Sequence, residues 1–237
     1  MGLSYEIRES DAPFVERVWR SRSHGLDTLI AIAVAQPDLV VWNDQGKTRV
    51  TLQGPETRAW RAPLPDHDDF FGIAFKPGVY LPHLPTGQFV NGDVALPAAS
   101  SRSFWLQGAA WEIPTYDNAE VFVARLVRAG LLQQEPGVAA ALRDEPPALS
   151  RRQVQRRFLH ATGLTQRVIQ QIERARQATV LLQQGTPIAA AAYETGYFDQ
   201  AHMTHALKHY VGQTPAQILD IHKSEPMSLL YNPDSLS

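Results

Sequence analysis

The 237-residue chain contains no cysteine and only three methionines. Without a thiol it can form no disulfide, no thiolate metal site and no cysteine nucleophile. It also lacks a run of 18 apolar residues and the pattern of a signal peptide, so we expect a cytoplasmic protein with no membrane partner. With 44% hydrophobic and 19% charged residues, the composition is typical of a globular chain of one or two domains.

Charge is scarce overall and unevenly placed. The formal net charge is −2, which by itself argues against a nucleic-acid partner. Residues 138–223, however, hold ten Lys and Arg against six Asp and Glu, a net charge of +4, whereas residues 1–137 hold twelve against sixteen, a net charge of −4. An acidic half joined to a basic half favours a sensor domain joined to a DNA-binding domain.

A short pattern occurs twice in the basic half, at residues 150–166 and 199–215. Gly163 and Thr165 recur as Gly212 and Thr214, each 49 positions later (212 − 163). A recurrence at a constant offset indicates one supersecondary unit that is used twice.

Each copy predicts a short helix with one apolar and one polar face. Ser150 and Asp199 are suited to the N-cap, and Gly163 and Gly212 are suited to the position after the helix. At 100° per residue, the apolar faces are Val154, Phe158 and Ala161 in the first copy, and Met203, Leu207 and Tyr210 in the second.

A shorter helix is expected before each copy, at residues 138–142 and 188–194. A helix, a tight turn and a second helix with an exposed polar face form the helix-turn-helix pattern, whose second helix enters the major groove. Gly196 makes the second turn, but Pro147 stands at the matching place in the first. Because proline cannot adopt a positive φ, we expect the first turn to have a different shape.

The segment 138–219 resembles the DNA-binding domain of AraC/XylS-type transcription regulators. The matching residues are Ser150, Val154, Arg156, Phe158, Gly163 and Thr165, then 172–176, Leu181 and Leu182, then Ile188, Ala189, Gly196, Tyr197, 199–202, Lys208, Gly212, Thr214 and Pro215. The resemblance implies two helix-turn-helix units joined by a linker helix, here at about residues 166–184. It also implies double-stranded DNA and RNA polymerase as partners, in the role of an activator or a repressor. We expect no cofactor and no enzyme activity.

The sequence departs from this family at two positions. His205 stands where the family usually has Arg, and Leu207 where it usually has Phe. We expect His205 to make a weaker, pH-sensitive contact with a base, and Leu207 to change only the packing.

The exposed faces of the two helices supply candidate DNA-binding residues, because Arg pairs with guanine, Gln with adenine, and Thr and Ala contact base edges. The candidates are Arg151, Arg152, Gln155, Arg156, Gln200, Ala201, Thr204, His205 and Lys208. We assign Arg152, Gln155 and Arg156 to base edges, and assign Arg151, Arg157 and Lys208 to phosphates or structural bonds. A solvated charged face for the arginines, and a cap or surface bond for Thr204 and His205, are the alternatives.

Residues 5–111 predict β-structure, with short segments rich in β-branched and aromatic residues between turns. The expected strands are 14–21, 29–35, 39–43, 49–52, 57–61 and 70–75, with a hairpin turn at 43–46 and an irregular cover at 81–99. A helix is expected within 114–132, with Asp117 as its cap and Glu120 completing a capping box. This helix packs on the β-structure or pairs with a second copy of the chain.

The N-terminal half also resembles the cupin-like domain in front of some AraC-type regulators, through residues 13–16, Trp19 and residues 75–82. In that family such domains bind an effector, dimerise, or do both. The expected fold is therefore α+β, with a β-rich cupin-like barrel at 1–132, the double helix-turn-helix domain at 137–223 and a tail at 224–237.

Aromatic residues on or beside the strands are candidates for an effector pocket. They are Trp42, Trp60, Phe71, Phe75, Tyr80 and His83; the alternative is that they fill the core. A metal site is not expected, because His24, His67 and His83 form no His-x-His pair, and the acidic residues around His67 are more typical of a solvated loop. No Gly-x-Ser-x-Gly elbow is present either.

The sequence therefore predicts a DNA-binding transcription regulator controlled by a small-molecule effector, and not an enzyme. The alternative is a constitutive regulator whose N-terminal half only forms a homodimer or binds a protein.

Overall fold

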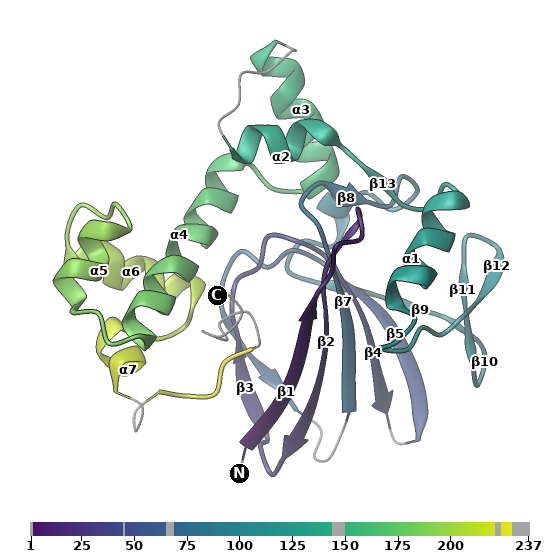
Figure 1. Ribbon diagram of the computed structural model, residues 1–237, viewed down its shortest axis with the longest axis horizontal. Coiled ribbons are helices and arrows are strands. Elements are labelled where there is room, and N and C mark those ends of the chain that lie inside the picture. Colours follow the sequence, from purple (N-terminus) through teal and green to yellow (C-terminus); the bar gives the residue numbers. More distant parts are fainter. Residues whose placement is uncertain (1, 45, 65–68, 144–149, 221–223, 229–237) are drawn as a thin grey trace.

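A six-stranded antiparallel sheet organises the N-terminal half. The computed structural model describes residues 2–44, 46–64, 69–143, 150–220 and 224–228. The strands are β1 (Gly2–Glu9), β2 (Val15–His24), β7 (Asp69–Phe75), β4 (Asp38–Asp44), β5 (Lys47–Gln53) and β9 (Asp93–Leu96), which follow one another across the sheet in this order (Figure 1). The six predicted strands overlap β2 to β7, although the ranges 29–35 and 57–61 share only residues 29–31 and 60–61 with β3 and β6. The sequence pattern does not anticipate β1 and β9.

Smaller strand pairs complete the β-rich half. β3 (Thr28–Ala31) pairs with β6 (Trp60–Pro63), and β8 (Val79–Tyr80) pairs with β13 (Gln133–Gln134). A third group contains β10 (Ala98–Ser100), β11 (Ser103–Leu106) and β12 (Ala109–Glu112). The segment expected to be an irregular cover contains β9 and the 3-10 helix η1 (Thr86–Gln88).

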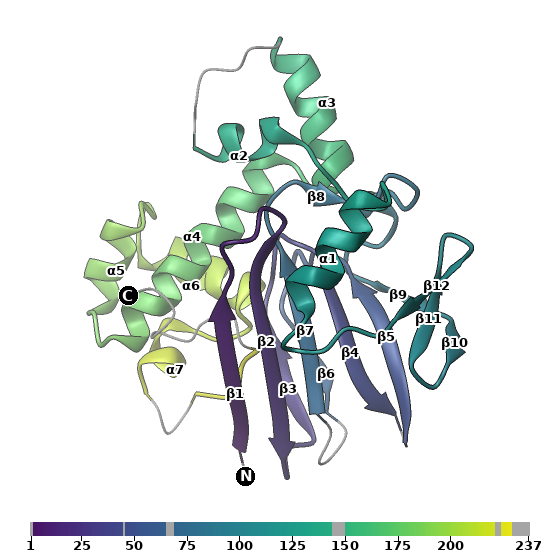
Figure 2. The same ribbon diagram turned by 45° about the vertical axis from the view of Figure 1, so that its right-hand side comes forward.

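Helix α1 (Ala119–Arg128) covers one face of the large sheet (Figures 1 and 2). Phe122 and Leu126 pack in one buried cluster with Val18, Leu39 and Ile73 of the strands. Of the two alternatives for this helix, packing on the β-structure is therefore the one observed.

The predicted cap of α1 is wrong by one residue. Asn118 occupies the N-cap position, and its Oδ1 accepts a hydrogen bond from the Thr115 N–H at 2.8 Å. Glu120 closes no capping box; its carboxylate instead accepts hydrogen bonds from the Arg8 guanidinium of β1, one of them at 2.8 Å. The Glu120 carboxylate, which the local pattern assigned to the start of the helix, therefore binds an arginine that is distant in the chain.

The C-terminal half is helical, so a β-rich half followed by an all-α half is confirmed. Its helices are α2 (Pro136–Leu142), α3 (Arg151–Thr162), α4 (Gln166–Gln183), α5 (Ile188–Glu194), α6 (Gln200–Tyr210) and α7 (Pro215–Leu219). The predicted linker helix is α4, which lies between the pair α2 and α3 and the pair α5 and α6 (Figure 1). The first turn, with Pro147, lies outside the described residues.

The two halves meet at the C-terminal ends of α3 and α6. The Thr86 hydroxyl donates to the Ala161 carbonyl of α3 at 3.0 Å. The backbone N–H groups of Ala33 and Ala59 donate to the carbonyls of Tyr210 and His209 of α6, both at 2.8 Å. The last carbonyls of a helix lack partners within it, so the N-terminal half caps both helices at equivalent ends.

Residues 224–228, expected to belong to a loose tail, lie beside β3. The Ile30 N–H donates to the Pro226 carbonyl at 2.9 Å, and the Ser228 N–H donates to the Ile30 carbonyl at 2.8 Å. Met227 pairs with Ile30 in a parallel bridge. This segment therefore returns from the helical half to extend the β3–β6 pair.

Candidate nucleic-acid interface and adjoining cavity

The start, end and docked face of α3 follow the predicted pattern. Ser150 and Gln153 form a capping box, in which Gln153 Oε1 accepts from the Ser150 N–H at 3.1 Å. Gly163 ends the helix with a φ of 70°, the left-handed conformation that glycine adopts without strain. Phe158 and Ala161 are buried, while Val154 is only partly buried.

The opposite face of α3 is open to solvent. Arg152, Gln155 and Arg156 are all exposed, and successive positions three or four apart share one helical face. Arg157 lies at the edge of this face, 3.7 Å from the Glu135 carboxylate in an ion pair. The side chain of Arg151 lies outside the described residues.

Helix α6 repeats this arrangement. Asp199 caps it by accepting from the His202 N–H at 2.7 Å, and Met203 and Leu207 are fully buried. The predicted residues Gln200, Ala201, His205 and Lys208 are exposed.

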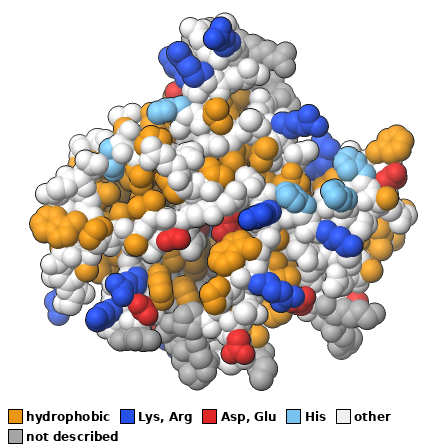
Figure 3. Space-filling view, turned by 180° about the vertical axis from the view of Figure 1, so that it is seen from behind, with side chains coloured by type: hydrophobic (Ala, Val, Ile, Leu, Met, Phe, Trp, Pro, Cys, Tyr) orange, Lys and Arg blue, Asp and Glu red, His pale blue; other side chains and the backbone are white. Residues whose placement is uncertain are grey.

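Thr204 is partly exposed on the same side of α6. Its hydroxyl donates to the Gln200 carbonyl at 2.7 Å, so only its oxygen lone pairs remain for a further partner. Figure 3 shows basic and histidine side chains over α3 at the top and over the α5–α6 pair at the right, with further basic side chains on the lower part of this face.

A group of residues on α4 was missed by the sequence reasoning. Arg167 and Arg174 line a groove of about 200 Å³ beside α6, together with Tyr197, His202 and Tyr210. The Arg174 guanidinium lies 5.7 Å from the centre of the Tyr197 ring. The seven-residue spacing of the two arginines on the polar side of the linker helix is the signal that could have identified them.

The second notable feature is a cavity of about 500 Å³ between the large sheet and the β3–β6 pair. It lies on the face of the sheet opposite α1. Its aromatic residues are Tyr5, Trp19, Trp42, Trp60 and Phe70, and its charged residues are Arg17, Asp38, Glu56 and Asp93.

Of the six predicted effector residues, the structure brings only Trp42 and Trp60 to this cavity. Phe75 is 1% exposed in the core beneath α1, and Phe71 packs edge-on against Tyr116. Side chains alternate between the faces of a strand, so Phe70 of β7 faces the cavity while Phe71 and Phe75 face α1.

The other two predicted effector residues lie near the join between the halves. Tyr80 packs edge-on against His160 of α3, with 5.4 Å between ring centres. His83 follows β8, and burial lowers the pKa of its imidazole. Neither side chain lines the cavity.

Two carboxylates of the cavity accept hydrogen bonds from indoles. Trp60 Nε1 donates to Glu56 Oε1 at 2.7 Å, and Trp19 Nε1 donates to Asp38 Oδ2 at 3.3 Å. Burial raises the pKa of each carboxyl group to about 7, although the nearby charge of Arg17 partly opposes this for Asp38. These acids were missed, because a lone Asp or Glu in a β-rich sequence gives no sign of which face it occupies.

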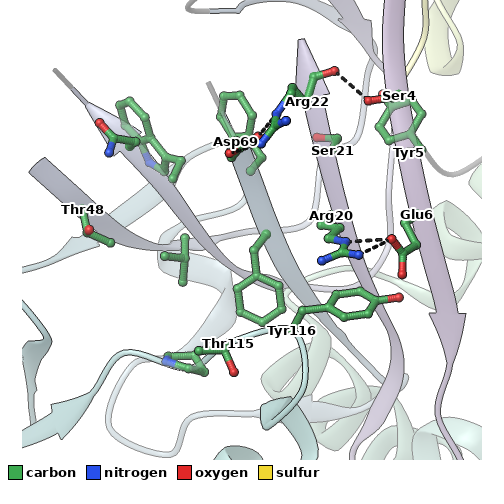
Figure 4. A pocket seen from close by; sticks show the side chains of 16 residues that line it. Ser4, Tyr5, Glu6, Arg20, Ser21, Arg22, Thr48, Asp69, Thr115 and Tyr116 are labelled. Atoms are coloured by element: carbon green, nitrogen blue, oxygen red, sulfur yellow. Dashed lines mark hydrogen bonds and ion pairs between the residues drawn. The ribbon is translucent and has the colours of Figure 1, made fainter. Parts of the chain in front are cut away.

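A second hollow, of about 710 Å³, lies at the open end of the sheet on the α1 side (Figure 4). Its arginines are already paired: Arg20 donates to Glu6 at 2.8 Å, and Arg22 donates to Asp69 at 2.7 Å. Figure 4 shows the Tyr116 ring beside Arg20. Because these charges satisfy one another, we interpret this hollow as a structural ion-pair surface.

Two negative findings concern the described part of the chain alone. There, no group of three or more His, Asp or Glu side chains is placed to hold a metal ion. Of the histidines weighed for such a site, His67 and the side chain of His24 lie outside the described residues. No described helix is both long and apolar enough to cross a membrane.

Comparisons with known proteins identify the helical half. Residues 148–220, which include α3 to α7, match a family described as a helix-turn-helix domain. No curated protein matches the chain. Among solved structures it is similar to ToxT from Vibrio cholerae, with 10% identity, a TM-score of 0.41, and coverage of 92% of this chain and 98% of that chain. An apo form of a ToxT variant gives 12% identity, a TM-score of 0.41, and coverage of 90% and 98%.

The segment 148–220 is therefore a helix-turn-helix domain. A helix-turn-helix domain places its second helix in the major groove of DNA, so the match agrees with the DNA-binding role predicted for this segment.

Proposed function

We propose that α3 and α6 enter successive major grooves on one side of the DNA, and that a small molecule in the cavity controls this binding. The observation that carries the first part is the pair of equivalently capped helices, each with a buried apolar face and an exposed polar face. Successive major grooves on one side of B-DNA lie about 34 Å apart.

The base contacts are assigned to the centres of the exposed faces. Arg152, Gln155 and Arg156 read base edges from α3, and Ala201 and His205 do so from α6. The Thr204 hydroxyl accepts a hydrogen bond from a base edge and does not donate one, because its proton is already donated to the Gln200 carbonyl.

Phosphate contacts are assigned to the flanking charges. Lys208 is exposed beyond the base-reading face of α6, and Arg167 is exposed on α4 beside it. Such contacts position the protein without reading sequence. We also propose a phosphate contact for Arg151, on the basis of the sequence alone.

The second part of the proposal is carried by the wall that the cavity shares with the helical half. Ile32 lines the cavity and also packs in the cluster that holds Met203 and Leu207 of α6. Its neighbour Ala33 donates to the Tyr210 carbonyl at the end of the same helix. A ligand that favours one position of this wall therefore favours one position of α6.

RNA polymerase as a partner and a homodimer through the N-terminal half complete the proposal, which rests here on the resemblance to the AraC family. A monomer reads an asymmetric site with its two helices. A dimer presents four such helices and reads two sites.

The test begins with footprinting of the full chain on the DNA upstream of its own coding sequence. On the site found, Arg152→Ala and Arg156→Ala should each cost ~1–3 kcal/mol of binding free energy and relax the preference at one base pair. Arg102→Ala is the matched control, because Arg102 is an exposed arginine in the turn between β10 and β11. Variants that bind like the control would contradict the assignment of α3.

Effector control is tested separately by titrating small molecules into the protein–DNA complex. A ligand that stabilises the full chain against heat and also changes its DNA affinity supports the proposal. A ligand that occupies the cavity and leaves the DNA affinity unchanged favours a constitutive regulator.

A further inference from the structure

The cavity walls carry the chemistry that attracts positive charge. Trp19, Trp42 and Trp60 line the cavity, and Trp42 stacks on Phe70 with 6.2 Å between the ring centres. Indole is the aromatic side chain whose π-system binds cations most strongly. The remaining lining is mainly apolar, which suits a ligand with a hydrophobic body.

The charges of the cavity are unbalanced toward the negative. Asp38, Glu56 and Asp93 line it, against Arg17 as the one cation among its lining residues. Arg17 is 9% exposed and already donates to the Glu16 carboxylate at 3.0 Å. Its positive charge is therefore shared between Glu16 and Asp38, and it does not offset Glu56.

Glu56 has no cationic partner among the described residues. Its one described side-chain bond is the hydrogen bond from the Trp60 indole. Burial is the main influence on its carboxyl group, and no positive charge opposes it. A desolvated carboxylate without a counter-ion is unfavourable, and a bound cation would remove that penalty.

We propose, on the basis of the effector role proposed above, that the cavity binds a small organic amine as its protonated ammonium. The N–H groups would donate to Glu56 and Asp38, and the apolar body would lie among the indoles. A cavity of about 500 Å³ is within the range that encloses a small ligand. A fully substituted ammonium could use the rings but could not donate to Glu56.

The experiment uses the full chain and four probes with one aromatic body. They are phenethylamine, its N,N,N-trimethyl ammonium derivative, 2-phenylethanol and phenylacetate. Binding is followed by quenching of indole fluorescence and by the shift in Tm. We expect phenethylamine to bind about tenfold or more tightly than each of the others, because its N–H donors meet charged acceptors.

Substitution of one acid tests the assigned partner. Glu56→Gln should reduce phenethylamine binding about tenfold and leave 2-phenylethanol binding little changed. Glu112→Gln, at an exposed glutamate of β12 outside the cavity lining, should bind all four probes like the parent. Should the Gln variant at 56 fold poorly, Asp38→Asn tests the second assigned acceptor and should likewise weaken phenethylamine binding while leaving 2-phenylethanol binding little changed.

The pH dependence gives an independent readout. The titratable and charged groups around Glu56 in the cavity are Asp38, Asp93, Arg17 and Tyr5. Since ammonium binding needs ionised carboxylates, the affinity for phenethylamine should rise from pH 5.5 to pH 8, with a smaller rise in Glu56→Gln. The affinity for 2-phenylethanol should stay constant.

Three results would overturn the inference: tighter binding of phenylacetate, an unchanged amine preference in Glu56→Gln, or no saturable binding of phenethylamine at millimolar concentration. Failure of the effector role looks different. In that case phenethylamine binds with the expected selectivity, and the DNA affinity of the full chain does not respond to it.

Discussion

At the scale of single residues, Asp38 is the clearest case of a side chain whose ionised form is disfavoured by burial. Desolvation in the cavity raises its pKa to about 7, against the opposing charge of Arg17 and the hydrogen bond from Trp19. In the unfolded chain it titrates near its ordinary value of about 4. Between these two values the folded protein binds more protons than the unfolded chain does.

The consequence is a stability that falls as pH rises. The contribution of Asp38 is fully present below about pH 4 and is lost as pH rises through about 7. Asp38→Asn should remove this loss, on the order of 4 kcal/mol between pH 4 and pH 8. Urea unfolding of the variant and the parent at several pH values measures it.

The exposed acid Asp93, at the same cavity, supplies the control. Asp93→Asn should leave the pH profile of unfolding close to that of the parent. A profile for Asp38→Asn that runs parallel to the parent would show that Asp38 carries no such loss.

At the scale of elements, the N-terminal half holds α3 and α6 through a small number of hydrogen bonds. Thr86 is 1% exposed, and its hydroxyl donates to the last-turn carbonyl of Ala161 in α3. Thr86→Val keeps the shape of the side chain and leaves that carbonyl without its donor. We expect a loss of ~1–2 kcal/mol in the free energy of unfolding.

Hydrogen exchange locates the effect. Amides in the last turn of α3 should exchange faster in Thr86→Val, while those of α6 should not change. Thr48→Val, at an exposed position of β5, is the control and should leave both helices as they are. Equal stability of the two variants would show that the bond does not hold α3.

The elements that sequence predicts well are those with local signals. Ser150 and Asp199 cap their helices as expected, and the turn glycines adopt the positive φ that their position demands. Local patterns do not reveal which face of β7 meets the cavity, since that depends on how the sheet packs. Phe71 and Phe75 were therefore assigned to the pocket, and Asp38 and Glu56 were overlooked. The contact of Ala33 with Tyr210 joins segments too distant in sequence for any local pattern to reveal.

At the scale of the whole molecule, residues 224–228 tie the helical half back to the cavity. The Glu225 carboxylate pairs with Arg61 of β6 at 2.6 Å, and the Tyr5 hydroxyl of β1 donates to the Met227 carbonyl at 3.3 Å. Ser228 also lines the cavity. These bonds link the β3–β6 pair, β1 and the helices into one structure.

A matched pair of truncations tests this link. A chain that ends at residue 223 loses the partners of Ile30, Arg61 and Tyr5. Its free energy of unfolding should fall by ~1–2 kcal/mol, which lowers its Tm by several degrees. A chain that ends at residue 228 keeps all of these bonds and should melt close to the full chain. Equal melting of both truncations would mean that the segment contributes little.

The wall formed around Ile32 and Ala33 has a consequence for the genes that such a regulator serves. Coupling between two sites is reciprocal, so a small molecule that alters the affinity for DNA has its own affinity altered by DNA to the same degree. Promoters whose operators bind the protein with different affinities would then respond at different concentrations of one small molecule. The operator sequence alone would set the concentration at which each gene responds, with no change in the protein.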